Sequence, residues 1–162
     1  MLARKFHLAV LLMCIPLHTC LASDTGMDRA TLRGLTSLKI VIDQPGNEME
    51  QEGYDRGQLQ SIMEQKLRDA GIKIDNDAVE FLGLSLTSAR AGRRSPVSLM
   101  MNLGLYQLVT LNRDKVTKTV AETWSAQRVL SVPPKALGQA VDDVVGELLD
   151  QFVKAYQSVN SK

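Results

Sequence analysis

Between residues 97 and 111 seven apolar side chains fall at odd positions, and this alternation constrains the fold more than any other stretch of the chain. Successive side chains of a strand point to opposite faces, so a period of two over this length predicts one long strand with one apolar face. Gln107 is the one interruption. Such a strand needs partners in a sheet, and its apolar face needs a second layer to cover it. The apolar positions are Val97, Leu99, Met101, Leu103, Leu105, Val109 and Leu111.

Shorter stretches predict the other strands of this sheet. Residues 38–42 alternate and then meet a turn at Gln44-Pro45-Gly46, while residues 82–87 alternate leucine with small polar residues. The segment 116–132 follows a polar tip at 112–115 and predicts the return strand of a hairpin. A period of two places three large side chains on one face of this return strand, and Ile72 and Ile74 predict a brief edge pairing. The three are Val120, Trp124 and Leu130.

The first helix is predicted at residues 55–70, where apolar side chains recur at helical spacing. Gly71 supplies the left-handed residue that commonly ends a helix. Leu67 and Ile72 then occupy the two positions that pack together across such an end. The sequence therefore predicts both the helix and the place where it stops.

A second helix of about six turns follows Pro133-Pro134, because proline is favoured at the start of a helix. Gly146 lies in the middle of this helix, where glycine costs roughly 1 kcal/mol relative to alanine. We expect this glycine to mark a close approach of the helix to the sheet. The acidic residues off the apolar stripe are expected to meet solvent; they are Asp142, Asp143, Glu147 and Asp150.

The order of elements is strand, helix, strand, strand, strand, helix (β-α-β-β-β-α). This order predicts an α+β, two-layer sandwich, with a largely antiparallel sheet and two helices packed on one face. We expect residues 1–22 to be a signal peptide, 23–36 a flexible lead-in, and 37–160 a single α+β domain.

The first 22 residues have the composition of a secretory signal. Arg4 and Lys5 precede the apolar run 8–17, and Cys20-Leu21-Ala22 offers small residues at the −3 and −1 positions of a cleavage site. The run is shorter than the roughly 20 apolar residues that span a membrane. We therefore expect export to the periplasm or the medium, with no transmembrane segment in the mature chain. Acylation of Cys20, as in a lipoprotein, is the alternative.

Cleavage after Ala22 leaves a chain of 140 residues (162 minus 22) that contains no histidine and no cysteine. A Ser-His-Asp triad, a Cys-His dyad, disulfides and zinc sites of the common His/Cys type are thereby excluded. Seventeen basic and 18 acidic residues give this chain a net charge of −1. No global field favours nucleic acid, so partner choice depends on local surface.

Arg90, Arg93 and Arg94 form the one concentrated basic patch, on a loop of small residues before Pro96. Guanidinium groups on such a loop would clamp phosphate or carboxylate groups of a partner or an envelope component. The alternative is a solvated loop whose charge discourages aggregation at a strand edge.

For three other sequence features a structural role is favoured over a functional one. Asp75-Asn76-Asp77 resembles part of a calcium loop but lacks the full ligand series, which favours a turn. Glu48 and Glu52 are a carboxylate pair of the kind that glycosidases use, in a segment that favours a solvated loop. Trp124 is expected to be buried in the core.

Four segments together resemble an uncharacterised group of small secreted bacterial proteins: residues 67–72 (LRDAGI), the long strand ending near Gln107, residues 122–125 (ETWS), and residues 150–160 (DQFVKAYQSVN). The resemblance implies an envelope location and transfers no activity, cofactor or catalytic residue. The order of elements is also similar to that of the N-terminal domain of TolB and of the CsgG-like lipoproteins. That second likeness is one of topology, and a fold does not imply a function.

These observations lead to the expectation of a secreted or periplasmic binding module of the bacterial cell envelope that is not an enzyme. We expect no catalytic residue, no cofactor and no bound metal, and a partner that is an envelope protein or envelope component. The binding surface would be the hairpin edge, the arginine loop, or both. A carboxylate-dependent hydrolase of cell-wall polymer and a lipid-binding accessory subunit are the alternatives. The oligomeric state stays open.

Overall fold

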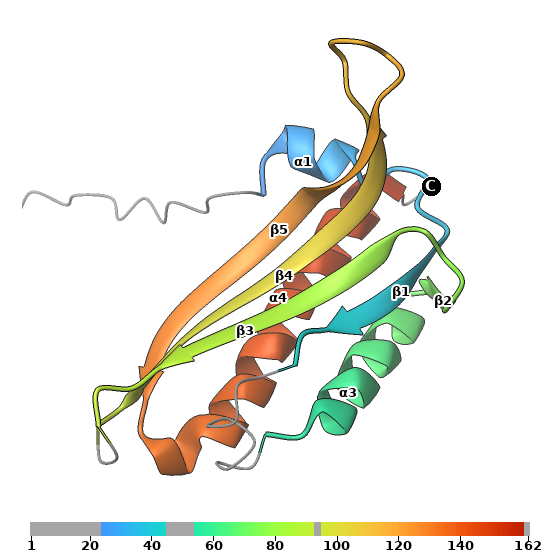
Figure 1. Ribbon diagram of the computed structural model, residues 1–162. Helices are drawn as coiled ribbons and strands as arrows, with labels where there is room; N and C mark the ends of the chain where they lie inside the picture. Colours follow the sequence, from blue (N-terminus) through green and yellow to red (C-terminus); the bar gives the residue numbers. More distant parts are fainter. Residues whose placement is uncertain (1–23, 45–53, 93–94, 161–162) are drawn as a thin grey trace, which may run out of the picture.

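The computed structural model describes residues 24–44, 54–92 and 95–160. The predicted signal peptide, Cys20, the Glu48 and Glu52 pair, and Arg93 with Arg94 all lie outside these described residues. The described part forms a sheet with two long helices on one side, as Figure 1 shows.

Five strands form the sheet in the spatial order β2-β1-β3-β4-β5. β3, β4 and β5 are antiparallel neighbours, whereas β1 runs parallel to both β2 and β3. The chain returns from β1 through a helix before it adds these strands, and such a crossover makes neighbouring strands parallel. The strands are β1 (Ser37–Ile42), β2 (Lys73–Ile74), β3 (Phe81–Ala89), β4 (Val97–Thr110) and β5 (Lys118–Val132).

Two helices, α3 (Arg56–Asp69) and α4 (Leu137–Asn160), cover the same face of the sheet. α4 lies behind β4 and β5 and is preceded by a single 3-10 turn, η1 (Pro134–Ala136). α3 lies beside α4 and covers β1 and β2. Among the described residues, no helix lies over the opposite face. The predicted α+β sandwich, with both long helices on one side, is confirmed.

The core lies between these two layers and is built from the alternating strand positions that the sequence predicts. Side chains of Leu99, Met101, Leu103 and Leu105 are fully buried under α4. Trp124 is also buried, and its ring meets the ring of Phe152 edge to face with centroids 5.2 Å apart. The predicted burial of Trp124 is therefore confirmed.

Residues 24–36 do not form the flexible lead-in that we expected. A short helix, α1 (Gly26–Ala30), begins at Thr25, whose side chain caps the amide of Asp28 while Asp28 caps the amide of Thr25. This reciprocal capping box satisfies two donors that a helix start otherwise leaves unpaired. Leu32 then enters the core, fully buried. Leu35 is buried in the same core, and the polar composition of the segment conceals the cap and both of these leucine anchors.

The end of α3 follows the predicted pattern. Gly71 has a φ of 79°, and the amide of Ile72 donates to the carbonyl of Leu67 at 2.9 Å. Both Leu67 and Ile72 are buried. These bonds and contacts define a Schellman end, in which glycine takes the left-handed position.

A β-bulge changes the faces of β5 relative to the sequence prediction. Leu105 pairs with Trp124, but Tyr106 pairs with Glu122, so Thr123 is an extra residue on β5. An extra residue reverses the alternation of all positions beyond it. Val120 therefore lies on the face opposite to Trp124, and its predicted place beside Trp124 is wrong.

One expectation for α4 is also wrong. No atom lies within 4 Å of the position that a Cβ on Gly146 would occupy, so this glycine does not mark a close approach to the sheet. The acidic residues off the apolar stripe meet solvent as expected, since Asp143, Glu147 and Asp150 are exposed and Asp142 is partly exposed, and two of them also make contacts with α3. Asp142 accepts a hydrogen bond from Gln58 at 2.7 Å, and Asp150 pairs with Lys66 of α3 at 2.8 Å. These bonds link the two helices along their outer edges.

Gly146→Ala should stabilise the protein by up to about 1 kcal/mol, because alanine has the higher helix propensity and its methyl group meets open space. Gly71→Ala is the matched control and should destabilise by about 1 kcal/mol, because its φ of 79° strains any residue with a Cβ. Thermal unfolding followed by circular dichroism measures both effects. A lower melting temperature for Gly146→Ala would show that the glycine has a packing role.

Candidate functional site

The uncovered face of the sheet carries most of the large apolar side chains that are exposed in the described residues. Seven such side chains are exposed, and four of them point outward from β4 and β5. A solvated sheet face normally alternates to polar residues, so this set marks the face as unusual. The four are Met100 (45% exposed), Leu108 (49%), Val120 (51%) and Val129 (75%).

One row of four side chains crosses this uncovered face at right angles to the strands. Register pairs Lys39 of β1 with Phe81 of β3, Phe81 with Tyr106 of β4, and Tyr106 with Glu122 of β5. We call these four residues the cross-strand row. It begins with a cation at β1 and ends with a carboxylate at β5.

Each neighbouring pair in the cross-strand row is in contact. The Lys39 Nζ lies 5.7 Å from the centre of the Phe81 ring, within the range of a cation-π interaction. The rings of Phe81 and Tyr106 stack with centroids 4.7 Å apart and planes inclined by 9°. The Tyr106 hydroxyl donates to Glu122 Oε2 at 2.9 Å. The row is thus continuous from one charge to the other.

Glycine beside the row lets its side chains lie close to the backbone. A Cβ on Gly83 would lie 3.0 Å from the Tyr106 ring, and a Cβ on Gly104 would clash with the Glu122 carboxylate. Asn102 fixes the same carboxylate by donating from Nδ2 to Oε2 at 3.0 Å. These contacts hold Glu122 in one orientation at the edge of the face.

The environment of Tyr106 keeps its hydroxyl protonated far into the alkaline range. Burial of the phenol, together with the hydrogen bond to Glu122 and its negative charge, raises the pKa of Tyr106 to about 12. Tyr106 is therefore a neutral hydrogen-bond donor at neutral pH, and Glu122 presents a negative charge.

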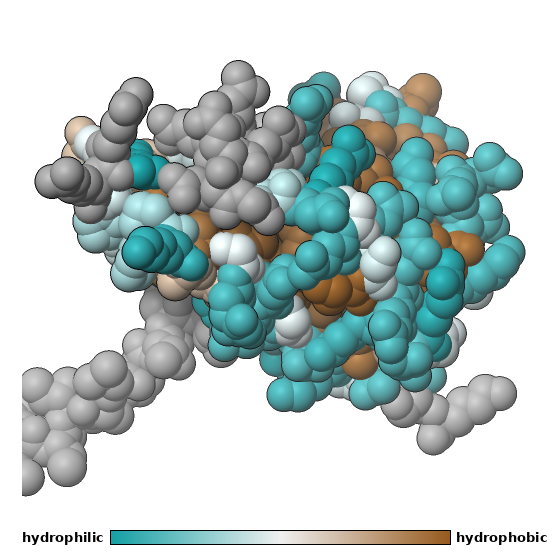
Figure 2. All heavy atoms as spheres, turned by 90° about the horizontal axis from the view of Figure 1, so that it is seen from below, coloured by the Kyte–Doolittle hydropathy of each residue, from teal (hydrophilic) through white to brown (hydrophobic). Residues whose placement is uncertain are grey.

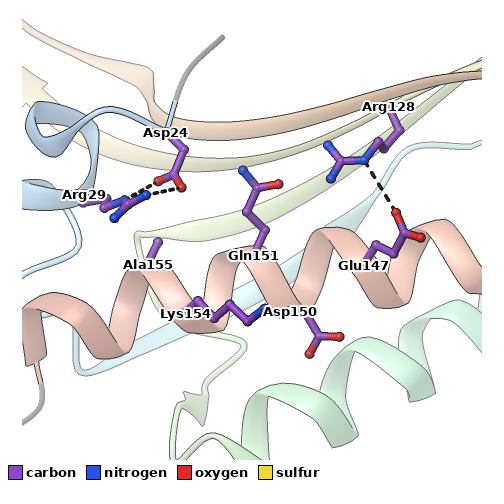
Figure 3. A pocket seen from close by; sticks show the side chains of 8 residues that line it. All are labelled: Asp24, Arg29, Arg128, Glu147, Asp150, Gln151, Lys154 and Ala155. Carbon is purple, nitrogen blue, oxygen red and sulfur yellow. Dashed lines mark hydrogen bonds and ion pairs between the residues drawn. The ribbon is translucent and has the colours of Figure 1, made fainter. Parts of the chain in front are cut away.

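A separate charged pocket of about 590 Å³ opens at the free edge of β5, between α1, β5 and α4 (Figure 3). Asp24 accepts two hydrogen bonds from Arg29 at 2.8 Å and one from the Trp124 indole at 3.2 Å. The bond to Arg29 is the main reason that the pKa of Asp24 lies below its ordinary value. These bonds fasten the N-terminal segment to the core tryptophan.

Two ion pairs hold the other side of this pocket. One joins two residues that line the pocket, and the other joins a lining residue to a residue outside it. Arg128 of β5 lies 3.6 Å from Glu147 of α4, and Asp150 bonds to Lys66 of α3. Three basic and three acidic side chains line the pocket, so their charges balance. Five of its six charged side chains are engaged in ion pairs that join β5 and α3 to α4 or fasten the N-terminal segment, and this is a structural role.

Of the three arginines of this loop, only Arg90 lies among the described residues. Its Nε donates to the carbonyl of Gly92 at 3.0 Å, so part of its hydrogen-bonding capacity serves its own loop. Arg90 also lines a shallow hollow with Ser98 and Ser131 at the far end of β4 and β5. Anion or partner binding by Arg90, Arg93 and Arg94 stays a prediction.

The Asp75-Asn76-Asp77 segment is a turn. Asp75 Oδ1 accepts from the amide of Asp77, and its Oδ2 accepts from Lys73 Nζ at 3.0 Å. The turn interpretation is therefore confirmed. In the described ranges, no three histidine, cysteine or acidic side chains are placed to hold a metal ion.

The cross-strand row is not evident from the sequence alone. The available signal was the pair of aromatic residues, Phe81 and Tyr106, at positions that alternate with the apolar face of their strands. Aromatic side chains at strand positions that are normally polar indicate a candidate binding surface. Which of them become neighbours depends on the register of strand pairing, which the sequence does not display. Glu122 was further hidden by the bulge at Thr123.

Comparison with known proteins does not place this chain in a family. No protein-family model matches the chain, and no curated protein matches it. The chain is similar to two solved structures of PelC from Paraburkholderia phytofirmans, both dodecamers. One, a single-substitution variant, has 17% identity and a TM-score of 0.43 over 80% of this chain and 90% of that chain. The other has 14% identity and a TM-score of 0.41 over 74% and 87%. These values are too low to place the chain in that family.

Figure 2 shows one end of the molecule, away from the uncovered face of the sheet. Seen from the end at which α4 begins, hydrophilic side chains surround small hydrophobic areas. None of the described helices is long and apolar enough to cross a membrane. The outward face of β4 and β5, with the cross-strand row, is therefore the strongest candidate site.

Glu122→Gln should lower the pKa of Tyr106 from about 12, because it removes the negative charge beside the phenolate. The pKa should stay above 10, since burial also raises it and is unchanged. Because the folded pKa lies above the unfolded one, the stability tied to Tyr106 is present below pH 10 and lost as the pH rises toward 12.

Alkaline titration of tyrosinate absorbance measures this shift, with Tyr106→Phe as the control that assigns the signal. An identical titration curve in Glu122→Gln would contradict the contact between the two side chains.

Proposed function

We propose that this chain is a binding module of the bacterial cell envelope, without enzymatic activity, that docks a partner protein on the uncovered face of its sheet. The observation that carries the proposal is the outward apolar set of Met100, Leu108, Val120 and Val129 on the same face as the cross-strand row. Exposed apolar side chains gathered on one face are typical of protein interaction sites.

The composition of the face supports a protein partner. Aromatic residues and methionine are enriched in protein interfaces, and the face offers Phe81, Tyr106 and Met100 on rigid strands. The charged ends of the row, Lys39 and Glu122, supply the polar contacts that fix orientation. A face of this kind matches an interface with an apolar centre and a polar rim.

The envelope location in this proposal rests on the leader-like residues 1–22. The carboxylates of the charged pocket support a role other than hydrolysis. Asp24 has a lowered pKa, whereas a catalytic proton donor needs a raised one, and Glu147 and Asp150 are held in ion pairs.

The test places a photoreactive phenylalanine analogue at Val129, in cells that produce the full-length protein with a C-terminal tag. Gln65 is the matched control, because it is exposed on α3 in the opposite layer. Irradiation should give a defined protein adduct from Val129 and none from Gln65, because only Val129 lies on the docking face.

Mass spectrometry then identifies the protein in the adduct. An adduct formed from Gln65 but not from Val129 would move the binding surface to the helical layer. The absence of an adduct at Val129 and also at Met100 would overturn the proposal.

A further inference from the structure

We propose that the partner on the uncovered face is a second copy of this chain, packed sheet against sheet about a twofold axis that runs along the strands. The inference rests on the proposed function, since it takes this face as the binding surface. It adds the identity of the partner and the geometry of the pair.

The cross-strand row has opposite charges at its two ends. Lys39 lies on β1 and Glu122 on β5, with β3 and β4 between them. Three strand spacings of about 4.8 Å separate them by roughly 14 Å, which is too far for an ion pair within one chain. Within the described ranges, neither side chain belongs to an ion pair of its own chain. Both charges are therefore available to a surface that carries the reverse order.

A second copy supplies this reverse order. Rotation by 180° about an axis along the strands, in the plane between two facing sheets, exchanges the β1 side of the row with the β5 side. Lys39 then faces Glu122 of the second copy, and Glu122 faces Lys39 of the second copy. Twofold interfaces are self-complementary in this way, because each contact occurs twice.

The alternative twofold axis is disfavoured by the same charges. An axis across the strands, also in the plane between the sheets, would place Lys39 opposite Lys39 and Glu122 opposite Glu122. Like charges that face each other across an interface repel and weaken association. The charge order of the row thus selects the axis along the strands, and aligned packing of two sheets is a common arrangement.

The middle of the row suits the same geometry. Phe81 faces Tyr106 of the second copy, which brings four aromatic rings to the centre of the interface. Three strands with nine residues each and the six residues of β1, at about 3.4 Å per residue and about 4.8 Å between strands, present a face of roughly 540 Å² per copy. Two such faces bury roughly 1,100 Å², which reaches the size of a specific interface.

Charge reversal tests the pairing directly. Lys39→Glu and Glu122→Lys should each weaken dimer formation by at least about tenfold, because each creates two like-charge contacts. An equimolar mixture of the two variants should restore the dimer, because both contacts then join opposite charges. The double variant should also dimerise. Sedimentation velocity across a concentration series measures all four samples.

Two controls keep the result interpretable. Circular dichroism establishes that each variant is folded, and Lys135→Glu makes the same charge change at an exposed position in η1, away from the sheet. Lys135→Glu should leave dimerisation unchanged. Recovery in the mixture cannot come from either chain alone, because each variant carries two like charges on the row.

Three outcomes overturn the inference: a wild-type protein that stays monomeric up to millimolar concentration, a dimer that both reversals leave intact, or a mixture of the variants that stays monomeric. If the wild type is monomeric but Val129 still crosslinks to another envelope protein, the second copy is excluded and the proposed function stands. If neither association occurs, both fail.

Discussion

The structure depends on burial of one face of the sheet alone. Alternation along β3 and β4 gives each strand one apolar face, and the apolar face of α4 packs against it. At the centre of this contact, Trp124 and Phe152 meet edge to face, and Asp24 accepts from the indole nitrogen of Trp124. The N-terminal segment is attached to the same core, because Asp24 also forms an ion pair with Arg29 of α1. Both long helices lie on one side, so no helix of the described residues covers the other face of the sheet.

The bulge at Thr123 determines what that uncovered face presents. Without the extra residue, Val120 and Glu122 would point toward the helical layer, where a carboxylate would be costly to bury. With it, Glu122 meets Tyr106 and Val120 joins Leu108 on the outside. Thr123 stabilises the bulge by donating to Gln107 Oε1 at 2.7 Å. One inserted residue therefore links the register of the hairpin to the composition of the candidate site.

Much of the fold is predictable from the sequence because its signals are local. The Schellman end at Gly71, the long strand from Val97 and the burial of Trp124 all follow from periodicity or from the demands of a single residue. The predictions that are wrong lie where the local sequence pattern does not determine the structure. The capping box at Thr25 orders a polar segment, the bulge at Thr123 reverses a strand, and Gly146 faces open space. The candidate site was not predictable, because the cross-strand row exists only through the register of four strands.

The central claim is that the uncovered face is covered by a protein in the working state. Methionine oxidation in intact cells tests it most directly, because Met100 lies on this face, 45% exposed, and Met27 lies on α1, 83% exposed. The account predicts that dilute purified protein oxidises at both residues, whereas protein in the cell oxidises at Met27 and is protected at Met100. Equal oxidation of Met100 in the two settings would contradict it.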